Sequence, residues 1–215
     1  MKFKTLGKSG LRVSELSLGA MTFGTEVNWG ADKEDSRKVF DAYVEAGGNF
    51  IDTANIYTMG SSEKFLADFM GSERERYVLA TKYTSNMYPD DPNAGGMHRK
   101  NMMQSLEASL KRLNTDYIDL YWVHAYDKLT PIEETMRALD DMVRQGKVLY
   151  VGISDAPAWI VSRANTLAEL RDWSSFIGLQ IEYSLKERSV ERDLIPMAQY
   201  FDMGITVWGT LASGL

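Results

Sequence analysis

The sequence predicts an α/β fold built on a parallel β-sheet. Three observations support this: short apolar segments recur along the 215 residues, amphipathic stretches separate them, and polar side chains follow several of them. The apolar segments are centred near Leu16, Phe50, Val78, Leu120, Val151, Leu179 and Val207. Repeated strand–helix units of this kind form parallel sheets with right-handed crossovers.

The elements follow in chain order. Residues 3–13, with Gly7 and Gly10 inside, predict a small hairpin ahead of the sheet. Helices are expected over 35–46, 100–113, 132–144 and 156–171. The buried face of the second helix is predicted to comprise Met103, Leu106, Leu110 and Leu113. Three helix ends are expected near Gly47, Asn114 and Gly146, because Gly and Asn readily take the left-handed cap.

Four polar residues stand at or just beyond strand ends. Asp52, Lys82 and His124 each close an apolar segment, and Tyr57 lies five residues past Asp52 in a turn-like stretch. If these segments are parallel strands of one barrel, all four side chains reach the same mouth, where such barrels do their chemistry. The pattern therefore predicts an enzyme with a proton-donating site.

The number of strands leaves two architectures open. All seven strand candidates lie in the chain up to Trp208. A closed eight-stranded barrel needs another strand and helix, roughly 30 more residues. Either the sheet is open, or we expect a barrel whose C-terminal part this chain lacks. No Gly-x-Gly-x-x-Gly follows the first strand, which gives a Rossmann fold little support. Without a linker, residues 1–215 are predicted to form a single domain.

Composition excludes several classes of function. A net charge of −6 argues against a basic surface that binds nucleic acid. No apolar segment approaches the roughly 18 residues of a membrane helix. The absence of cysteine excludes disulfides and thiolate metal sites. The two histidines, His98 and His124, lack metal-ligand spacing, so no metal site is expected, and His98 is predicted to be solvated. We expect a cytoplasmic protein.

Seven motifs together carry a family resemblance. They are LGKSGLRVS at 6–14, GNFIDTA at 48–54, ATK at 80–82, SLKRL at 109–113, DYIDLY at 116–121, RQGKV at 144–148 and GIS at 152–154. In this order they resemble the aldo-keto reductases, and the likeness runs through residues 1–215. The resemblance implies a TIM (β/α)8-type barrel with an N-terminal hairpin, about seven of its strands being present and the eighth strand and last helices missing.

The resemblance also implies roles for the four polar residues. Tyr57 would donate a proton to a carbonyl oxygen, Lys82 and Asp52 would tune it, and His124 would orient the substrate. A free tyrosine has a pKa of about 10 and is a poor acid at neutral pH unless a nearby cation stabilises its phenolate. Lys82 is expected to supply that charge, and His124 to donate to the same oxygen as negative charge develops.

The implied cofactor is NADPH, with NADH as the open alternative. The resemblance assigns cofactor contacts to Gly19, Ala20, Met21, Asp52, Ser154, Asp155, Gln180, Trp208, Gly209, Thr210 and Leu211. Two departures stand out: the family usually has Asn at the position of Asp155, and Ser-Pro where this chain has Gly209 and Thr210. Since the segment that grips the adenosine phosphate lies beyond residue 215, we expect the chain alone to bind NADPH weakly.

Two long loops are predicted to shape a pocket for a small carbonyl substrate. Residues 21–32 carry Phe23 and Trp29, and residues 83–98 carry Tyr88. Neither the particular substrate nor the oligomeric state follows from the sequence.

Two other functions remain open at this point. One is a non-catalytic barrel that binds cofactor and regulates a partner, as the β subunits of potassium channels do. The other is an aldolase that uses Lys82 as a Schiff base, which would leave the placement of Tyr57 and Asp52 unexplained.

Overall fold

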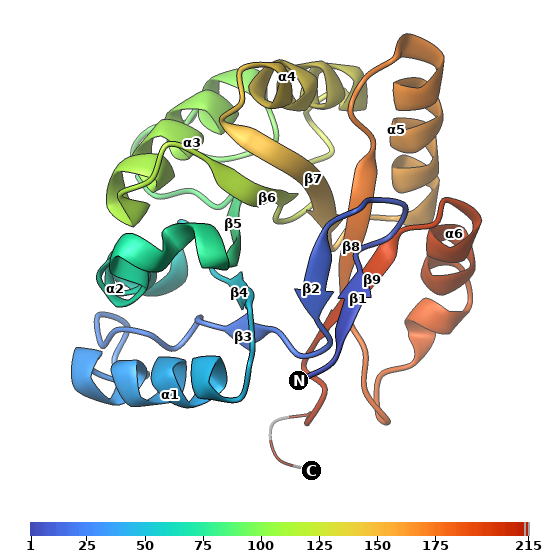
Figure 1. The fold of residues 1–215 in the computed structure, drawn as a ribbon. Coiled ribbons are helices and arrows are strands. Elements are labelled where there is room, and N and C mark those ends of the chain that lie inside the picture. Colours follow the sequence, from blue (N-terminus) through green and yellow to red (C-terminus); the bar gives the residue numbers. More distant parts are fainter. Residues whose placement is uncertain (213, 215) are drawn as a thin grey trace.

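The computed structural model describes residues 1–212 and 214, and its central element is a curved parallel sheet (Figure 1). Seven strands pair in sequence order, each parallel to the next. They are β3 (Leu18–Gly19), β4 (Phe50–Asp52), β5 (Val78–Tyr83), β6 (Ile118–Val123), β7 (Val148–Ser154), β8 (Phe176–Glu182) and β9 (Gly204–Trp208). The predicted α/β fold with seven barrel strands is confirmed, and β3 and β9 form the two edges of the described sheet.

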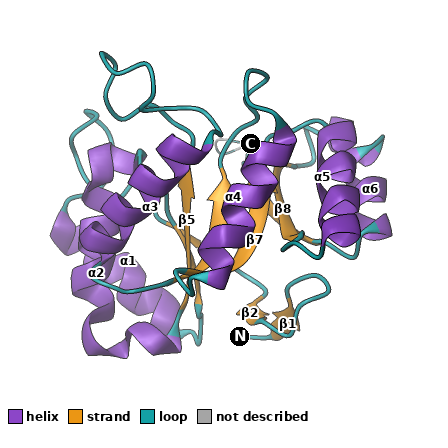
Figure 2. Ribbon diagram, turned by 90° about the horizontal axis from the view of Figure 1, so that it is seen from above, coloured by secondary structure: helices purple, strands orange, loops and turns teal. Residues whose placement is uncertain are grey.

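Six α-helices cover the outer face of this sheet (Figures 1 and 2). They are α1 (Lys33–Glu45), α2 (Ser61–Met70), α3 (Arg99–Leu113), α4 (Ile132–Arg144), α5 (Ala158–Arg171) and α6 (Leu194–Tyr200). Short 3₁₀ turns span Tyr57–Gly60, Gly71–Arg76 and Ser189–Glu191. The predicted helix ends are confirmed, since Gly47, Asn114 and Gly146 all take positive φ angles there.

The N-terminal hairpin, β1 (Phe3–Thr5) paired antiparallel with β2 (Arg12–Ser14), lies at one end of the sheet (Figure 2). Its turn contains Gly7 at φ +55°, where a Cβ would come within 2.4 Å of the Ile177 carbonyl oxygen and 2.7 Å of the Gly204 amide nitrogen. Only glycine allows the turn to approach the first residues of β8 and β9 this closely. The hairpin therefore closes the amino end of the sheet.

A tryptophan fills the interior next to this plug. Trp122 of β6 is fully buried, and a Cβ on Gly152 or Gly178 would lie within 2.3 Å or 2.8 Å of its indole ring. Gly152 of β7 and Gly178 of β8 are direct partners in the sheet, so together they leave the space that the indole occupies. Leu6 of the hairpin occupies the same kind of space against Gly204.

Several local predictions are corrected. The first strand lies at Leu18–Gly19 rather than around Leu16, whose side chain is exposed. On α3, Met103 is exposed and Met102 is buried in its place, because the helix presents the neighbouring residue to the sheet. His98 is not simply solvated: it is the N-cap of α3, where its Nδ1 accepts a hydrogen bond from the Asn101 amide at 3.3 Å.

Two helices were not predicted. The first, α2, has Gly60 as its N-cap and no capping side chain, so the usual start signal is missing. The second, α6, is seven residues long and contains Pro196 near its start, a residue more often found outside helices.

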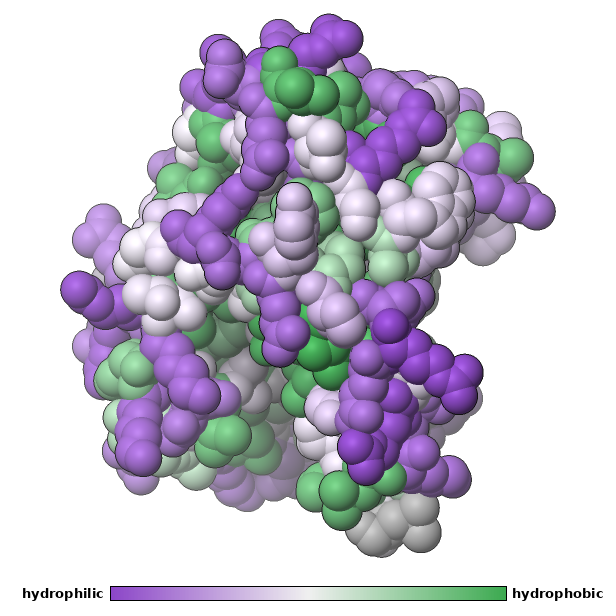
Figure 3. Space-filling model, turned by 90° about the vertical axis from the view of Figure 1, so that its right-hand side faces the viewer, coloured by the Kyte–Doolittle hydropathy of each residue, from purple (hydrophilic) through white to green (hydrophobic). Residues whose placement is uncertain are grey.

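Hydrophilic residues cover much of the molecular face in Figure 3, and apolar residues appear there as separate patches. No helix within the described part of the chain is both long and apolar enough to span a bilayer.

Candidate active site

Three neighbouring strands bring Asp52, Lys82 and His124 to the carboxyl end of the sheet. Asp52 is the last residue of β4, Lys82 is the penultimate residue of β5, and His124 directly follows β6. Side chains along a strand alternate between its two faces. Asp52, Lys82 and His124 therefore face the interior. They lie on the same face of the sheet as Phe50 and Leu120, which are at the hairpin end.

Lys82 is the centre of this cluster. Its side chain is fully buried, and its Nζ donates to the Tyr57 hydroxyl at 3.1 Å and to the Thr53 carbonyl at 2.8 Å. It also forms an ion pair with Asp52. Burial alone would lower the pKa of Lys82, but Asp52 and Tyr57 more than compensate, so the pKa is raised and the ammonium stays charged. Lys82 is thus in direct contact with both Tyr57 and Asp52.

Tyr57 and His124 face each other edge to face, with ring centroids 5.8 Å apart and planes at 80°. The Nδ1 atom of His124 is buried without a hydrogen-bond partner among the described residues. Burial, with a smaller contribution from the Lys82 charge, lowers the pKa of His124 to about 3. The imidazole is therefore neutral near pH 7.

Two opposing effects set the pKa of Tyr57. Burial raises the pKa of its phenol, and the Lys82 charge only partly counteracts this rise. The Lys82 ammonium stabilises the phenolate form of Tyr57, but burial has the larger effect and the nearby Asp52 carboxylate adds to it, so the pKa is raised. Tyr57 consequently carries its proton throughout the neutral pH range.

A second group of polar residues stands on the neighbouring strands β7 to β9. Ser154 and Gln180 are direct partners across β7 and β8, and both are buried. Gln180 Nε2 donates to Asp52 Oδ1 at 3.2 Å, which joins this group to the first. Trp208, 43% exposed, points its Nε1 toward Asp155 Oδ1 at 3.4 Å. A hydroxyl, an amide and a flat aromatic face thus line one side of the rim.

The other residues assigned to the cofactor lie at the carboxyl ends of the edge strands. Gly19 ends β3, and a Cβ built on it would meet no atom within 4 Å. The Ala20 amide donates a hydrogen bond to the Asp52 carbonyl at 2.9 Å. The side chain of Met21 is exposed. Past the end of β9, the exposed residues are Gly209, Thr210 and Leu211. These two sets flank the sheet edges, and among the described residues no hydrogen bond joins either set to the side chain of Tyr57 or Lys82.

Of the three predicted pocket residues, two are exposed and one is not. Trp29 and Tyr88 are 51% and 67% exposed on the loops after β3 and β5. Phe23 is a correction: it is buried against Phe69, with ring centroids 6.2 Å apart, because the apolar ring packs into the core beneath the loop. Its backbone carbonyl nevertheless contacts Thr58.

A depression of about 510 Å³ adjoins this rim between the loops that follow β5 and β6. It is lined by Thr84, Gly96, Ala125, Tyr126, Asp127, Lys128 and Leu129. Because Ala125 directly follows His124, this depression opens beside the polar cluster.

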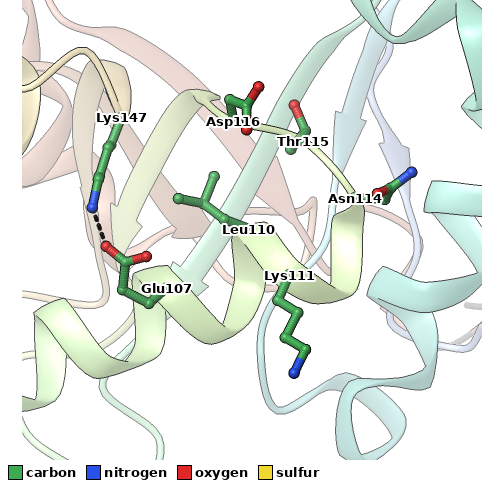
Figure 4. A pocket seen from close by; sticks show the side chains of 7 residues that line it. All are labelled: Glu107, Leu110, Lys111, Asn114, Thr115, Asp116 and Lys147. Carbon is green, nitrogen blue, oxygen red and sulfur yellow. Dashed lines mark hydrogen bonds and ion pairs between the residues drawn. The ribbon is translucent and has the colours of Figure 1, made fainter.

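A second depression has a volume of about 490 Å³, and its lining residues are shown in Figure 4. Its lining comes from the end of α3 and the approaches to β6 and β7: Glu107, Leu110, Lys111, Asn114, Thr115, Asp116 and Lys147. An ion pair between Glu107 and Lys147 neutralises part of its charge. Since β6 and β7 begin here, this depression opens at the amino end of the sheet, away from His124.

Two contributors to the site were missed in the sequence. Thr53 supplies a backbone carbonyl to Lys82, and Asn55 is buried with both amide atoms unpaired among the described residues. Both follow Asp52 within three positions, but a backbone acceptor and a buried amide leave no periodic signal in a sequence. Within residues 1–212 and 214, no three His, Cys, Asp or Glu side chains lie together as metal ligands.

Comparison with known proteins shows one consistent relationship. The model of the aldo/keto reductase family matches residues 15–215. Norsolorinic acid reductase of Aspergillus flavus is 42% identical over 216 residues, 96% of this chain and 56% of that protein. Aryl-alcohol dehydrogenase [NADP(+)] of Phanerodontia chrysosporium is 42% identical over 220 residues, 95% of this chain and 57% of that protein. The chain thus spans a little over half the length of these curated relatives.

Proposed function

Because the chain belongs to the aldo/keto reductase family, we propose that it is an oxidoreductase that uses NADP(H) to interconvert a carbonyl compound and its alcohol. The names of the relatives support this, since they include reductases and an NADP(+)-dependent aryl-alcohol dehydrogenase. The observation that carries the proposal is the contact of the Tyr57 hydroxyl with the buried ammonium of Lys82. A regulatory barrel without catalysis is not favoured by relatives with such names.

Tyr57 acts as the proton donor. Its raised pKa keeps it protonated, and an alkoxide is a stronger base than a phenolate, so proton transfer to the developing alkoxide is favourable. Lys82 stabilises the phenolate that remains, at a distance of 3.1 Å in the resting state. Asp52 holds Lys82 in place and balances its charge in the buried site.

His124 orients the carbonyl group. With a pKa of about 3, its imidazole is neutral, so it donates a hydrogen bond from a neutral ring and adds no positive charge beside Lys82. The Tyr57 and His124 rings lie edge to face with centroids 5.8 Å apart, so the two donors are neighbours. Two donors aimed at one oxygen stabilise the negative charge that develops on it.

The residues on β7 to β9 fit a nicotinamide cofactor. Ser154 and Gln180, adjacent in the sheet, offer a hydroxyl and an amide suited to a carboxamide, and the exposed face of Trp208 suits a planar ring. When bound, the cofactor supplies or accepts the hydride. The edge residues Gly19 to Met21 and Gly209 to Leu211 would lie along its remaining length.

An aromatic or polycyclic carbonyl compound is the proposed substrate class. The exposed rings of Trp29 and Tyr88 stand on the loops around the rim and offer flat apolar surfaces. Two of the relatives carry names that refer to an aryl alcohol and to norsolorinic acid.

A rate assay tests the proposal. NADPH absorbance is followed with benzaldehyde for the wild-type chain, Tyr57→Phe and Tyr200→Phe. Loss of the proton donor should lower kcat roughly a hundred- to ten-thousand-fold, whereas Tyr200→Phe, which removes a hydroxyl from an exposed ring at the end of α6, should leave kcat nearly unchanged. Equal rates for wild type and Tyr57→Phe would contradict the assigned role.

A further inference from the structure

Tyr57 begins a turn in which the next three residues are all left-handed. Thr58 has φ 44° and ψ 44°, Met59 has φ 54° and ψ 33°, and Gly60 has φ 91° and ψ −1°. Glycine adopts this conformation freely, but threonine and methionine do so only against a steric cost. Such backbone persists where the surrounding structure enforces it, and it often occurs at functional sites.

The side chain of Thr58 is what enforces the turn. It is 3% exposed, and its hydroxyl donates to the Phe23 carbonyl at 2.5 Å while accepting the Ser62 amide at 3.1 Å. Gly24 packs so closely that a Cβ there would lie 2.7 Å from both Cβ and Oγ1 of Thr58. The hydroxyl of Thr58 therefore has both a donor and an acceptor role and no room to move.

Phe23 and Gly24 belong to the loop of residues 20–31, which we call the β3 loop. Two more hydroxyls connect the segment after Tyr57 to this loop. Ser61 donates to the Glu26 carboxylate, and Ser62 donates to the Ala20 carbonyl at 2.7 Å. The β3 loop is closed on itself, because Gly24 and Ala31 are joined by a hydrogen bond of 2.8 Å. Thr58, Ser61 and Ser62 thus fasten the segment after Tyr57 to a compact loop.

This loop is also the one that presents Trp29 to solvent at the rim. The Tyr57 side chain is held from its other end by Lys82 and His124. The proton donor is therefore placed by two sets of contacts: its hydroxyl by the polar cluster, and its backbone by the β3 loop.

The geometry points to Thr58 as a positioning residue for Tyr57. Its hydroxyl, bonded to the Phe23 carbonyl, holds the strained turn that aims the Tyr57 ring at Lys82, and it couples this ring to the β3 loop. A substrate that contacts Trp29 would then influence the placement of the proton donor through the same hydrogen bonds. This inference rests on the proposed oxidoreductase function and assigns to Thr58 a role that acts only through Tyr57.

Three variants separate positioning from simple structural support. Thr58→Val keeps the shape but removes the hydroxyl, Thr58→Ser keeps the hydroxyl, and Thr135→Val is the matched control. Thr135 is also buried and its hydroxyl also reaches a backbone carbonyl, that of Met97 at 3.4 Å, but it lies on α4 away from the turn. With NADPH and benzaldehyde, Thr58→Val should lower kcat roughly 10- to 100-fold, with the KM for NADPH within about twofold of wild type because the cofactor residues are untouched.

A second readout does not depend on activity. The chain is labelled with ¹³C at the tyrosine Cζ, and the Tyr57 signal is identified as the one that is missing from Tyr57→Phe. The pKa of the Tyr57 phenol is then measured by NMR titration. Burial raises the Tyr57 pKa in the wild type, so a ring released from its position should titrate closer to an ordinary tyrosine. Thr58→Val should therefore lower the Tyr57 pKa, whereas Thr58→Ser and Thr135→Val should keep the wild-type pKa.

A variant on the opposite side of the contact checks the result. Gly24→Ala places a methyl group against Thr58 and should shift the Tyr57 titration in the same direction as Thr58→Val. If Thr58→Val and Gly24→Ala both titrate like the wild type, or if kcat for Thr58→Val equals that of Thr135→Val, the positioning role is refuted. Lack of benzaldehyde reduction by the wild-type chain would refute the proposed function instead, and the Tyr57 titration would still decide whether Thr58 positions this ring.

Discussion

The two ends of the same strands differ sharply in chemistry. At the hairpin end, the interior is filled by apolar side chains such as Val13, Phe50 and Trp122. At the other end, the same inward-facing rows finish in Asp52 and Lys82, which are paired and largely buried. Parallel barrels use the first end for stability and the second for function. Here the difference is produced within single strands only a few residues long.

The contrast shows which features of the polar end lower the stability of the fold. Burial of Trp122 contributes favourable packing, whereas burial of Lys82 and Asp52 requires that two charges leave water. His124 adds a buried Nδ1 atom that has no hydrogen-bond partner within the described part of the chain, and the turn at Thr58 adds backbone strain. Function and stability are therefore expected to respond to different substitutions, and four changes test this division.

The largest effect is expected at the hairpin end. Trp122→Ala removes a fully buried indole that is enclosed by Gly152 and Gly178. The free energy of unfolding, measured by urea denaturation, should fall by about 3–5 kcal/mol. Trp159→Ala, at an exposed position on α5, serves as the control and should change it by no more than about 0.5 kcal/mol. Similar losses for both variants would remove the distinction between core and surface tryptophans.

A paired substitution tests the charged end. Lys82→Met leaves the Asp52 carboxylate without its cation and should lower the free energy of unfolding by about 3 kcal/mol. The double variant Asp52→Leu with Lys82→Met removes both charges and should recover most of that loss, since apolar replacement of a buried ion pair is often neutral or stabilising. Benzaldehyde reduction should remain absent in the double variant. A double variant as unstable as Lys82→Met would show that the pair itself stabilises the fold.

The sequence predicted much of this division, and the reasons are local. Strand ends and helix periods follow from neighbouring residues, which is why Lys82 and His124 were placed correctly beside Tyr57. The turn at Thr58 could not be predicted, because neither Thr nor Met signals a left-handed backbone and its partner, Phe23, lies 35 residues away. The burial of Phe23 and the raised pKa of Tyr57 likewise depend on packing by distant elements.

The third effect concerns pH. The folded state lowers the pKa of His124 from 6.5 to about 3, so between these values the unfolded chain binds a proton that the folded chain refuses. Stability should therefore fall as the pH decreases below 6.5, by about 1.4 kcal/mol per pH unit. In urea titrations, wild type should lose about 2 kcal/mol more than His124→Gln between pH 6.5 and pH 5. Parallel pH profiles for the two proteins would mean that His124 is not buried as a neutral ring.

The smallest effect is expected in the left-handed turn. Met59 is exposed and left-handed, so Met59→Gly should raise the free energy of unfolding by about 0.5–1 kcal/mol as the steric strain is relieved. Met103→Gly, at an exposed position within helix α3, should instead lower it by about 1 kcal/mol. The opposite signs are read from urea denaturation, and a loss at Met59 would argue against strain in the turn.

The most direct test of the proposed chemistry follows the hydride itself. The chain is incubated with benzaldehyde and NADPH carrying deuterium at the transferable position of the nicotinamide ring, and the alcohol product is analysed by mass spectrometry. We expect one deuterium on the carbinol carbon with wild type and almost no product with Tyr57→Phe. Alcohol without deuterium, or equal amounts from both proteins, would contradict the account.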